Sequence, residues 1–130
     1  MKVLFIYNDI DQMNLRDDPL QIGTLSAFIK EHGYEVELLC LQANMLENEL
    51  LSYIGSIDPD LINFSILTHQ WEHAKRYASI IKKGFRVPIL CSGPHPSYLP
   101  EEVIRDPNIN MVCIEESEQA LLDVLGRMEW

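Results

Sequence analysis

Residues 2–7 read KVLFIY and residues 35–40 read EVELLC, and a stretch with helical spacing of its apolar residues ends between them at Gly33. A strand, a helix and a second strand in this order form the unit from which parallel sheets are built. The second run alternates in part between glutamates and apolar residues, whereas the first is apolar almost throughout. We therefore expect residues 35–40 at an edge of a sheet and residues 2–7 in its interior.

The same alternation continues along the rest of the chain. Further strand-length apolar runs cover residues 61–66, 87–92 and 110–114, and the helical stretches before the first two of these end near Gly55 and Gly84. Parallel strands of one sheet are joined by right-handed crossovers that place helices on its faces. The sequence therefore predicts an α/β fold, a flavodoxin-like (Rossmann-like) doubly wound five-stranded parallel sheet of order 2-1-3-4-5 with helices on both faces.

The length and composition limit the class of protein. A chain of 130 residues with 47% hydrophobic and 23% charged residues suffices for one globular domain, so we expect residues 1–130 to form a single domain. The net charge of −10 opposes binding to nucleic acid or to anionic membranes. The apolar runs are too short to cross a bilayer and the N-terminus lacks the layout of a signal peptide, which favours a cytoplasmic protein.

The three cysteines suggest no metal or redox centre. Cys40, Cys91 and Cys113 each lie within or at the end of an apolar run, so we expect buried thiols. The chain contains no C-x-x-C cluster, and we therefore expect no zinc or iron–sulfur site of its own.

The connections that leave the strands are the candidate ligand loops. They cover residues 8–19, 67–70, 93–100 and 115–117, and the first, at 12 residues, is long for a strand-to-helix link. All four open at the carboxyl edge of the sheet, where doubly wound proteins bind ligands. The first loop has neither a dinucleotide-binding nor a phosphate-binding glycine motif. The third strand ends without the aspartate that a phosphoacceptor domain needs.

Three short motifs stand at these strand ends: Asp18-Pro19-Leu20-Gln21-Ile22-Gly23, Ser65-Ile66-Leu67 and Ser92-Gly93. They resemble the D-x-H-x-x-G, S-x-L and G-G signature of the cobalamin-binding domain found in methionine synthase and methylmalonyl-CoA mutase. The separation of the first two motifs, residues 24–64, is close to that of the signature. Two positions depart from it, since Leu20 occupies the histidine position and Ser92 replaces the first glycine.

Other segments are more similar to the domain at the N-terminus of cobalamin-dependent radical S-adenosylmethionine enzymes. These segments are P-x-x-x-G at 19–23, G-P-H-P-S at 93–97, L-P-E-E at 99–102 and E-S-E at 116–118, although Glu115 stands where that family has glycine. The resemblance covers nearly the whole chain. It implies cobalamin bound with its own base and any histidine off the metal, and no catalytic residue or metal ligand from this chain.

The resemblance also implies a site and a partner. S-adenosylmethionine and a 4Fe–4S cluster would belong to a downstream radical domain, because this chain ends soon after its last helix and lacks the cysteine motif of that domain. The cofactor-binding residues that it implies are Leu20, Gly23, Ser65, Leu67, Thr68, Ser92, Gly93, Pro94, His95 and Glu116.

Simpler explanations exist for several of these residues. Gly23 and Gly93 suit plain backbone geometry, and the Ser65 hydroxyl suits a bond to neighbouring backbone. His95 fits a loop residue that shapes the upper rim by hydrogen bonding, while His69 and His73 are spaced to share a helix face but lack an evident third metal ligand. The alternative functions are a cofactor-free flavodoxin-like signalling or protein-interaction domain, and a small hydrolase or transferase for which no catalytic triad is evident.

Overall fold

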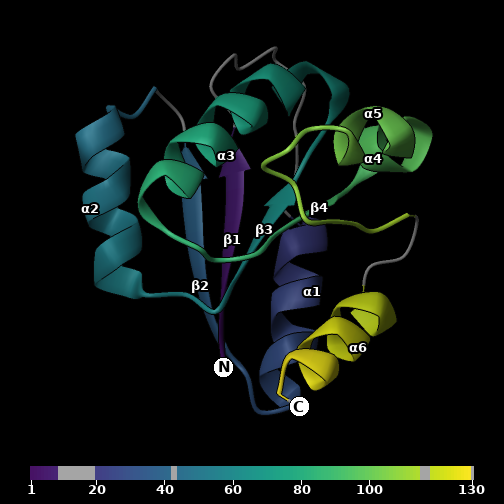
Figure 1. Ribbon diagram of the computed structural model, residues 1–130. Coiled ribbons are helices and arrows are strands. Elements are labelled where there is room, and N and C mark those ends of the chain that lie inside the picture. Colours follow the sequence, from purple (N-terminus) through teal and green to yellow (C-terminus); the bar gives the residue numbers. More distant parts are fainter. Residues whose placement is uncertain (9–19, 42–43, 115–117, 130) are drawn as a thin grey trace.

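The computed structural model describes residues 1–8, 20–41, 44–114 and 118–129 (Figure 1). The side chains of residues 8 and 20–22 are outside this description. The described strands form one sheet in which every pairing is parallel, in the order β2-β1-β3-β4-β5. The strands are β1 (Lys2–Asn8), β2 (Glu35–Leu41), β3 (Leu61–Ser65), β4 (Ile89–Ser92) and β5 (Met111–Val112). The predicted doubly wound fold and strand order are confirmed.

Helices cover both faces of the sheet. They are α1 (Leu20–Glu31), α2 (Glu47–Ile57), the 3-10 helix η1 (Thr68–Gln70), α3 (Trp71–Gly84), α4 (Pro94–Tyr98), α5 (Pro100–Ile104) and α6 (Glu118–Met128). Helices α1 and α6 lie together on one face, and α2 and α3 on the other (Figure 1). None of the described helices is long and apolar enough to cross a membrane.

Two apolar layers follow from the alternation of side chains along each strand. In β3, Leu61 packs in the layer under α1 and α6, whereas Ile62 packs in the layer under α2 and α3. The described side chains of β1 from Val3 to Tyr7 are therefore apolar on both faces, as in an interior strand of a parallel sheet, and β3 is apolar throughout its face toward α2 and α3. In β2, Glu35 and Glu37 are exposed, which confirms that this strand is an edge.

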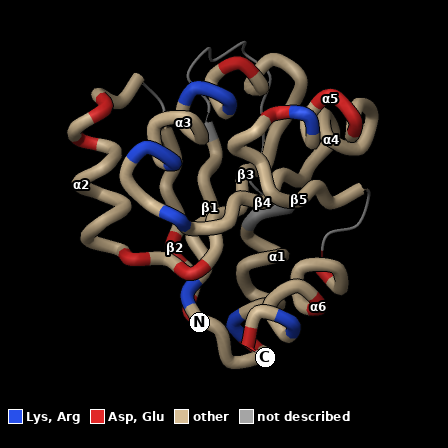
Figure 2. Tube along the Cα trace, in the orientation of Figure 1, with Lys and Arg blue, Asp and Glu red and all other residues tan. Residues whose placement is uncertain are grey.

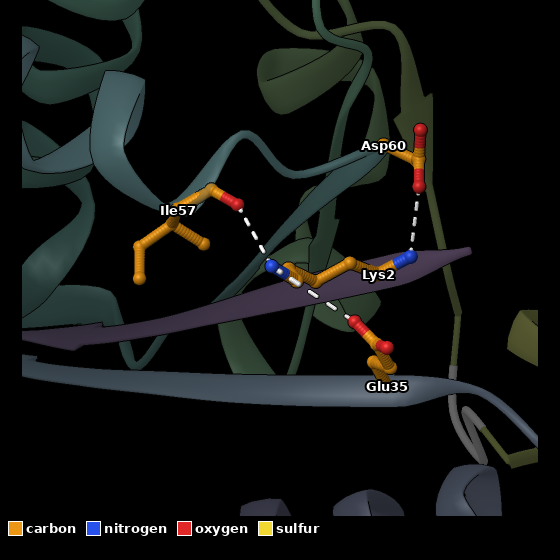
Figure 3. A network of polar contacts seen from close by, with 4 residues as sticks. All are labelled: Lys2, Glu35, Ile57 and Asp60. Atoms are coloured by element: carbon orange, nitrogen blue, oxygen red, sulfur yellow. Dashed lines mark hydrogen bonds and ion pairs between the residues drawn. The ribbon is translucent and has the colours of Figure 1, made fainter.

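The amino edge of the sheet is closed by contacts of Lys2 (Figure 3). Its backbone N–H donates to Asp60 Oδ2 at 2.8 Å, and its Nζ donates to the Ile57 carbonyl at 3.0 Å. The same ammonium lies 3.9 Å from the Glu35 carboxylate on β2. These contacts join the start of β1 to β2 and to the turn before β3, so this edge is occupied by the protein's own groups.

Several element ends differ from the sequence-based expectation. Strand β4 begins at Ile89 rather than at residue 87, because Pro88 has no N–H to donate to a neighbouring strand. Strand β5 is shorter than the predicted 110–114, since the Asn110 side chain accepts from Ile89 N–H at 2.9 Å. Helix α2 passes Gly55 and ends where Asp58 adopts a left-handed conformation with φ of 52°.

The segment predicted as a loop at residues 93–100 is largely helical. Helix α4 has Pro94 in its first turn and α5 has Pro100 in its first turn. Proline has a fixed φ that suits the first helical position, and its missing N–H would be unpaired there in any case. The expectation of a plain connection was wrong because these prolines start helices as well as interrupt them.

Charged side chains are distributed along the helices (Figure 2). Acidic residues predominate on α2 and α5, while α3 carries several basic residues. Two of the α3 lysines form ion pairs, Lys75 with Glu72 at 3.0 Å and Lys83 with Glu47 at 3.6 Å. The basic face of α3 is thus partly neutralised by acidic neighbours, in keeping with the net charge of −10.

The cysteines occupy two different environments. Cys91 and Cys113 are buried as predicted, but Cys40 is exposed, because it lies on the edge strand. Burial raises the pKa of the Cys91 thiol, and the nearby Asp106 carboxylate raises it further. The Cys91 thiol is therefore protonated at neutral pH and shielded from reagents.

We expect iodoacetamide to alkylate Cys40 rapidly in the native protein and to leave Cys91 unmodified until denaturant is added. Cys40 is exposed, whereas Cys91 is buried and its thiol has a raised pKa. Peptide mass spectrometry with and without denaturant measures this difference. Equal labelling of Cys40 and Cys91 in the native protein would contradict the placement of β4 in the sheet interior.

Candidate ligand site at the carboxyl edge

The ends of β3 and β4 lie side by side at the carboxyl edge of the sheet. Ser65 and Ser92, both predicted site residues, are paired in register. Beyond them, Ile66 N–H donates to the Ser92 carbonyl at 2.8 Å, so the pairing continues into the connections. Leu67 and Thr68 follow on one chain segment, and Gly93, Pro94 and His95 follow on the other. The structure thus brings together seven of the ten residues that the resemblance implied.

A row of polar side chains runs down one face of this edge. It consists of Asn63, Ser65 and Ser92, which we call the polar row. Asn63 is in register with Phe5 on β1 and Leu90 on β4, and both of these pack in the layer under α1 and α6. Since paired residues of parallel strands face the same side, the polar row faces α1 and α6.

Asn63 was not singled out by the sequence analysis, and it is the most deeply placed member of the row. Its side chain is fully buried, and its Oδ1 accepts from Ser92 Oγ at 3.3 Å. Its Nδ2 is buried and has no hydrogen-bond partner among the described residues. Such an unpaired donor destabilises a protein by about 1–3 kcal/mol. The available signal was one amide in the otherwise apolar run Leu61–Phe64, a pattern that β-propensity disfavours.

Buried polar residues gather at this edge. The four that the described part of the chain contains are Asn63, Gln70, Ser92 and His95. Each lies in β3, in β4 or in the first helical turns that follow them. Polar groups are retained in such positions when they bind one another or a ligand.

Gly93 holds the two connections together. Its φ of 104° and ψ of −174° belong to a region that is nearly exclusive to glycine. A Cβ at this position would lie 2.9 Å from both the backbone nitrogen and the backbone oxygen of Ile66. Backbone geometry therefore requires this glycine, whatever else it does in a ligand site.

His95 is buried within α4 and is not the rim residue of a loop that the sequence suggested. Its Nδ1 lies 3.4 Å from Thr68 Oγ1, and its ring lies against Trp71 with the centroids 5.5 Å apart. The predicted hydrogen-bonding role is thus seen, in a buried setting. His95 Nε2 and Trp71 Nε1 have no hydrogen-bond partner among the described residues.

His69 in η1 and His73 in α3 are both partly buried. The described residues contain no group of three side chains of the types that ligate metals. The structure therefore adds no third ligand to this histidine pair.

Gly23 presents the opposite situation to Gly93. It lies in α1, is exposed, and would have no atom of the described residues within 4 Å of an added Cβ. A glycine inside a helix is less favourable than alanine by about 1 kcal/mol, and the packing of the described residues gives no reason for it. The side chain of Leu20 and all of Glu116, the other two predicted site residues, lie outside the described residues.

A doubly wound parallel sheet with buried polar groups at its carboxyl edge defines a ligand-binding α/β domain. The family model described as B12 binding domain matches residues 17–125, and the chain belongs to this family. The match includes all ten predicted site residues.

Among curated proteins, the cytidylyl-2-hydroxyethylphosphonate methyltransferase of Streptomyces wedmorensis is 23% identical in an alignment 126 residues long that covers 80% of this chain and 23% of that protein. The radical methyltransferase TsrM from Kitasatospora setae is similar in structure, with a TM-score of 0.86, 15% identity, and coverage of 99% of this chain and 26% of TsrM. The cobalamin-dependent radical enzyme OxsB has a TM-score of 0.78 and 24% identity over 98% of this chain and 18% of OxsB. The chain therefore spans about a quarter or less of the length of these relatives.

We expect Gly93→Ala to lower the free energy of unfolding by about 1–3 kcal/mol, because the new Cβ meets the Ile66 backbone and the conformation disfavours any side chain. The matched control is Gly126→Ala in α6, where nothing lies within 4 Å of the added Cβ. This control should be neutral or stabilising by up to about 1 kcal/mol. Urea denaturation of both variants measures the difference, and equal stabilities would refute the close contact.

Proposed function

We propose that this chain binds cobalamin with the nucleotide end of the cofactor against the polar row, as the cofactor module of a methyltransferase-type or other radical S-adenosylmethionine enzyme. The observation that carries the proposal is the polar row, in which Asn63 and Ser92 are buried and Ser65 is partly buried. The innermost amide, Asn63 Nδ2, has no hydrogen-bond partner among the described residues. Family membership over residues 17–125 supports the identity of the ligand.

The residues present fit such a ligand. A nucleotide end offers hydrogen-bond acceptors, and the polar row offers the Asn63 Nδ2 donor and the Ser65 hydroxyl. Helix α1 follows β1, so its first turn lies at the carboxyl edge on the face that the row also lines. Gly23 itself has no side chain, which allows a large cofactor to approach the helix backbone at this position.

Leu20 supports a binding mode without a histidine ligand. It occupies the position at which the family signature has histidine, and leucine has no lone pair to coordinate a metal. When bound, cobalamin supplies a cobalt ion that can carry a methyl group. The contribution of this chain is to hold the cofactor and to leave the metal without a protein ligand.

The remainder of the reaction belongs to another part of the parent protein in this proposal. The relatives named above include a methyltransferase and radical enzymes that are several times longer than this chain. We assign S-adenosylmethionine and the 4Fe–4S cluster to a downstream radical domain, which is the proposed partner of this module.

Titration of the purified chain with hydroxocobalamin should produce a bound species whose visible spectrum is that of the base-off cofactor. Gly23→Ala should weaken binding about tenfold or more by steric exclusion, while leaving stability unchanged or higher by up to about 1 kcal/mol. Gly126→Ala is the control and should bind like the unmodified chain. Absence of any spectral change with the unmodified protein would instead favour a cofactor-free interaction domain.

The cobalt(II) form of the complex should show no nitrogen superhyperfine splitting in electron paramagnetic resonance spectra, because neither the cofactor's base nor a histidine would bind the metal. His69→Ala tests an alternative ligand from this chain, since His69 follows β3 at the same edge of the sheet. Splitting that is present in the unmodified protein and absent in His69→Ala would overturn the proposed mode.

A further inference from the structure

We propose that Asn63 Nδ2 donates a hydrogen bond to an acceptor on the nucleotide end of the bound corrinoid, so that Asn63 makes this site selective for complete corrinoids over truncated ones. This inference rests on the proposed function and assigns a residue that none of the sequence motifs includes. It starts from the orientation of the amide. Ser92 Oγ donates to Asn63 Oδ1 at 3.3 Å, and Nδ2 has no partner among the described residues, so Nδ2 is the group that a ligand would use.

The surroundings of Asn63 strengthen any bond that it forms. It lies two positions before Ser65 in β3, deeper in the sheet than the strand end, and its side chain is fully buried. Its in-register neighbours, Phe5 and Leu90, are apolar and buried. Because water does not compete at such a position, pairing the amide with an acceptor removes an unfavourable burial of the free donor.

The same surroundings select the kind of acceptor. The neighbours that define the position, Phe5, Leu90, Ser65 and Ser92, are all uncharged. An anionic phosphate oxygen would be poorly stabilised there, since burial of a charge requires a paired countercharge. A flat aromatic base with a neutral ring nitrogen fits best, and that nitrogen can accept a bond only when the base has left the cobalt.

The test compares two proteins against three corrinoids. The proteins are the unmodified chain and Asn63→Leu, which keeps a similar volume and removes the donor. The corrinoids are hydroxocobalamin, aquocobinamide, which lacks the nucleotide end, and p-cresolyl cobamide, which keeps the ribose and phosphate but has no ring nitrogen. Visible-spectrum titrations give each affinity, and for each protein we take the ratio of the hydroxocobalamin affinity to the affinity for each of the other two corrinoids. The free energy of detaching the base from cobalt is the same for both proteins, so it cancels when these ratios are compared between the proteins.

We expect Asn63→Leu to weaken hydroxocobalamin binding about tenfold, the loss expected for one hydrogen bond in a buried site, and to leave cobinamide binding within about threefold. Retention of p-cresolyl cobamide binding by the variant assigns the acceptor to the ring nitrogen. A tenfold loss of p-cresolyl cobamide affinity in the variant would instead assign the acceptor to the ribose or phosphate. Either assignment supports the inference.

Two results would overturn it. One is unchanged hydroxocobalamin affinity in Asn63→Leu, which would mean that a water molecule or nothing at all meets the amide. The other is an equal loss for cobinamide, which would show a general disturbance of the site. If Asn63→Leu does not fold, Asn63→Ala takes its place, and the same ratios of corrinoid affinities are measured and compared with those of the unmodified chain.

The control variant is Asn110→Ala, which removes an amide from the opposite edge of the same sheet, where Asn110 Oδ1 accepts from Ile89 N–H and Lys82 Nζ. It should lose stability without changing the ratio of affinities. Failure of the unmodified chain to bind hydroxocobalamin would refute the proposed function itself, whereas binding with an unchanged ratio in Asn63→Leu would refute only the role of Asn63.

Discussion

The close approach of Gly93 to the backbone of Ile66 is the constraint on which the carboxyl edge depends. Ile66 is held on both sides, since its N–H donates to the Ser92 carbonyl at 2.8 Å and its carbonyl accepts from His95 N–H at 3.1 Å. Only a residue without Cβ allows this arrangement. It fixes where η1 and α4 begin, and it brings His95 against Trp71 and Thr68.

At the carboxyl edge, different groups lie on the two faces of the sheet. The Trp71 and His95 rings lie beyond the strand ends, with Trp71 in the apolar layer under α2 and α3, whereas the polar row faces α1 and α6. The sheet is apolar on both faces along most of its interior strands, so the row is a local departure from the pattern that stabilises the fold. Departures of this kind are common at functional sites, where binding and stability make different demands.

Much of the fold followed from local patterns. The partial alternation of residues 35–40 identified the edge strand. The strand-to-helix connections indicated the carboxyl edge as the candidate ligand edge, which stays a prediction. Features that depend on the three-dimensional arrangement were not accessible. Pro88 shortens β4 through a missing donor, and the Asn110 side chain substitutes for a backbone partner of Ile89. Neither effect changes the periodicity of the sequence.

Some residues of the candidate site could likewise be predicted from the sequence, and others could not. Motif order singled out Ser65, Ser92 and Gly93, but it could not distinguish Gly93, which the backbone requires, from Gly23, for which the described residues give no packing reason. The role proposed for Asn63 depends on its hydrogen bond from Ser92 and on its Nδ2, which has no partner among the described residues. Both are visible only once the strands are aligned.

Nuclear magnetic resonance of the isotopically labelled chain, with and without hydroxocobalamin, tests the central claim most directly. The account predicts shifts of the Asn63 side-chain amide and of the Ser65 and Ser92 backbone amides, with the amides of Asp60 and Asn110 at the opposite edge unchanged. Shifts confined to other surfaces, with these three groups unaffected, would contradict the placement of the ligand against the polar row.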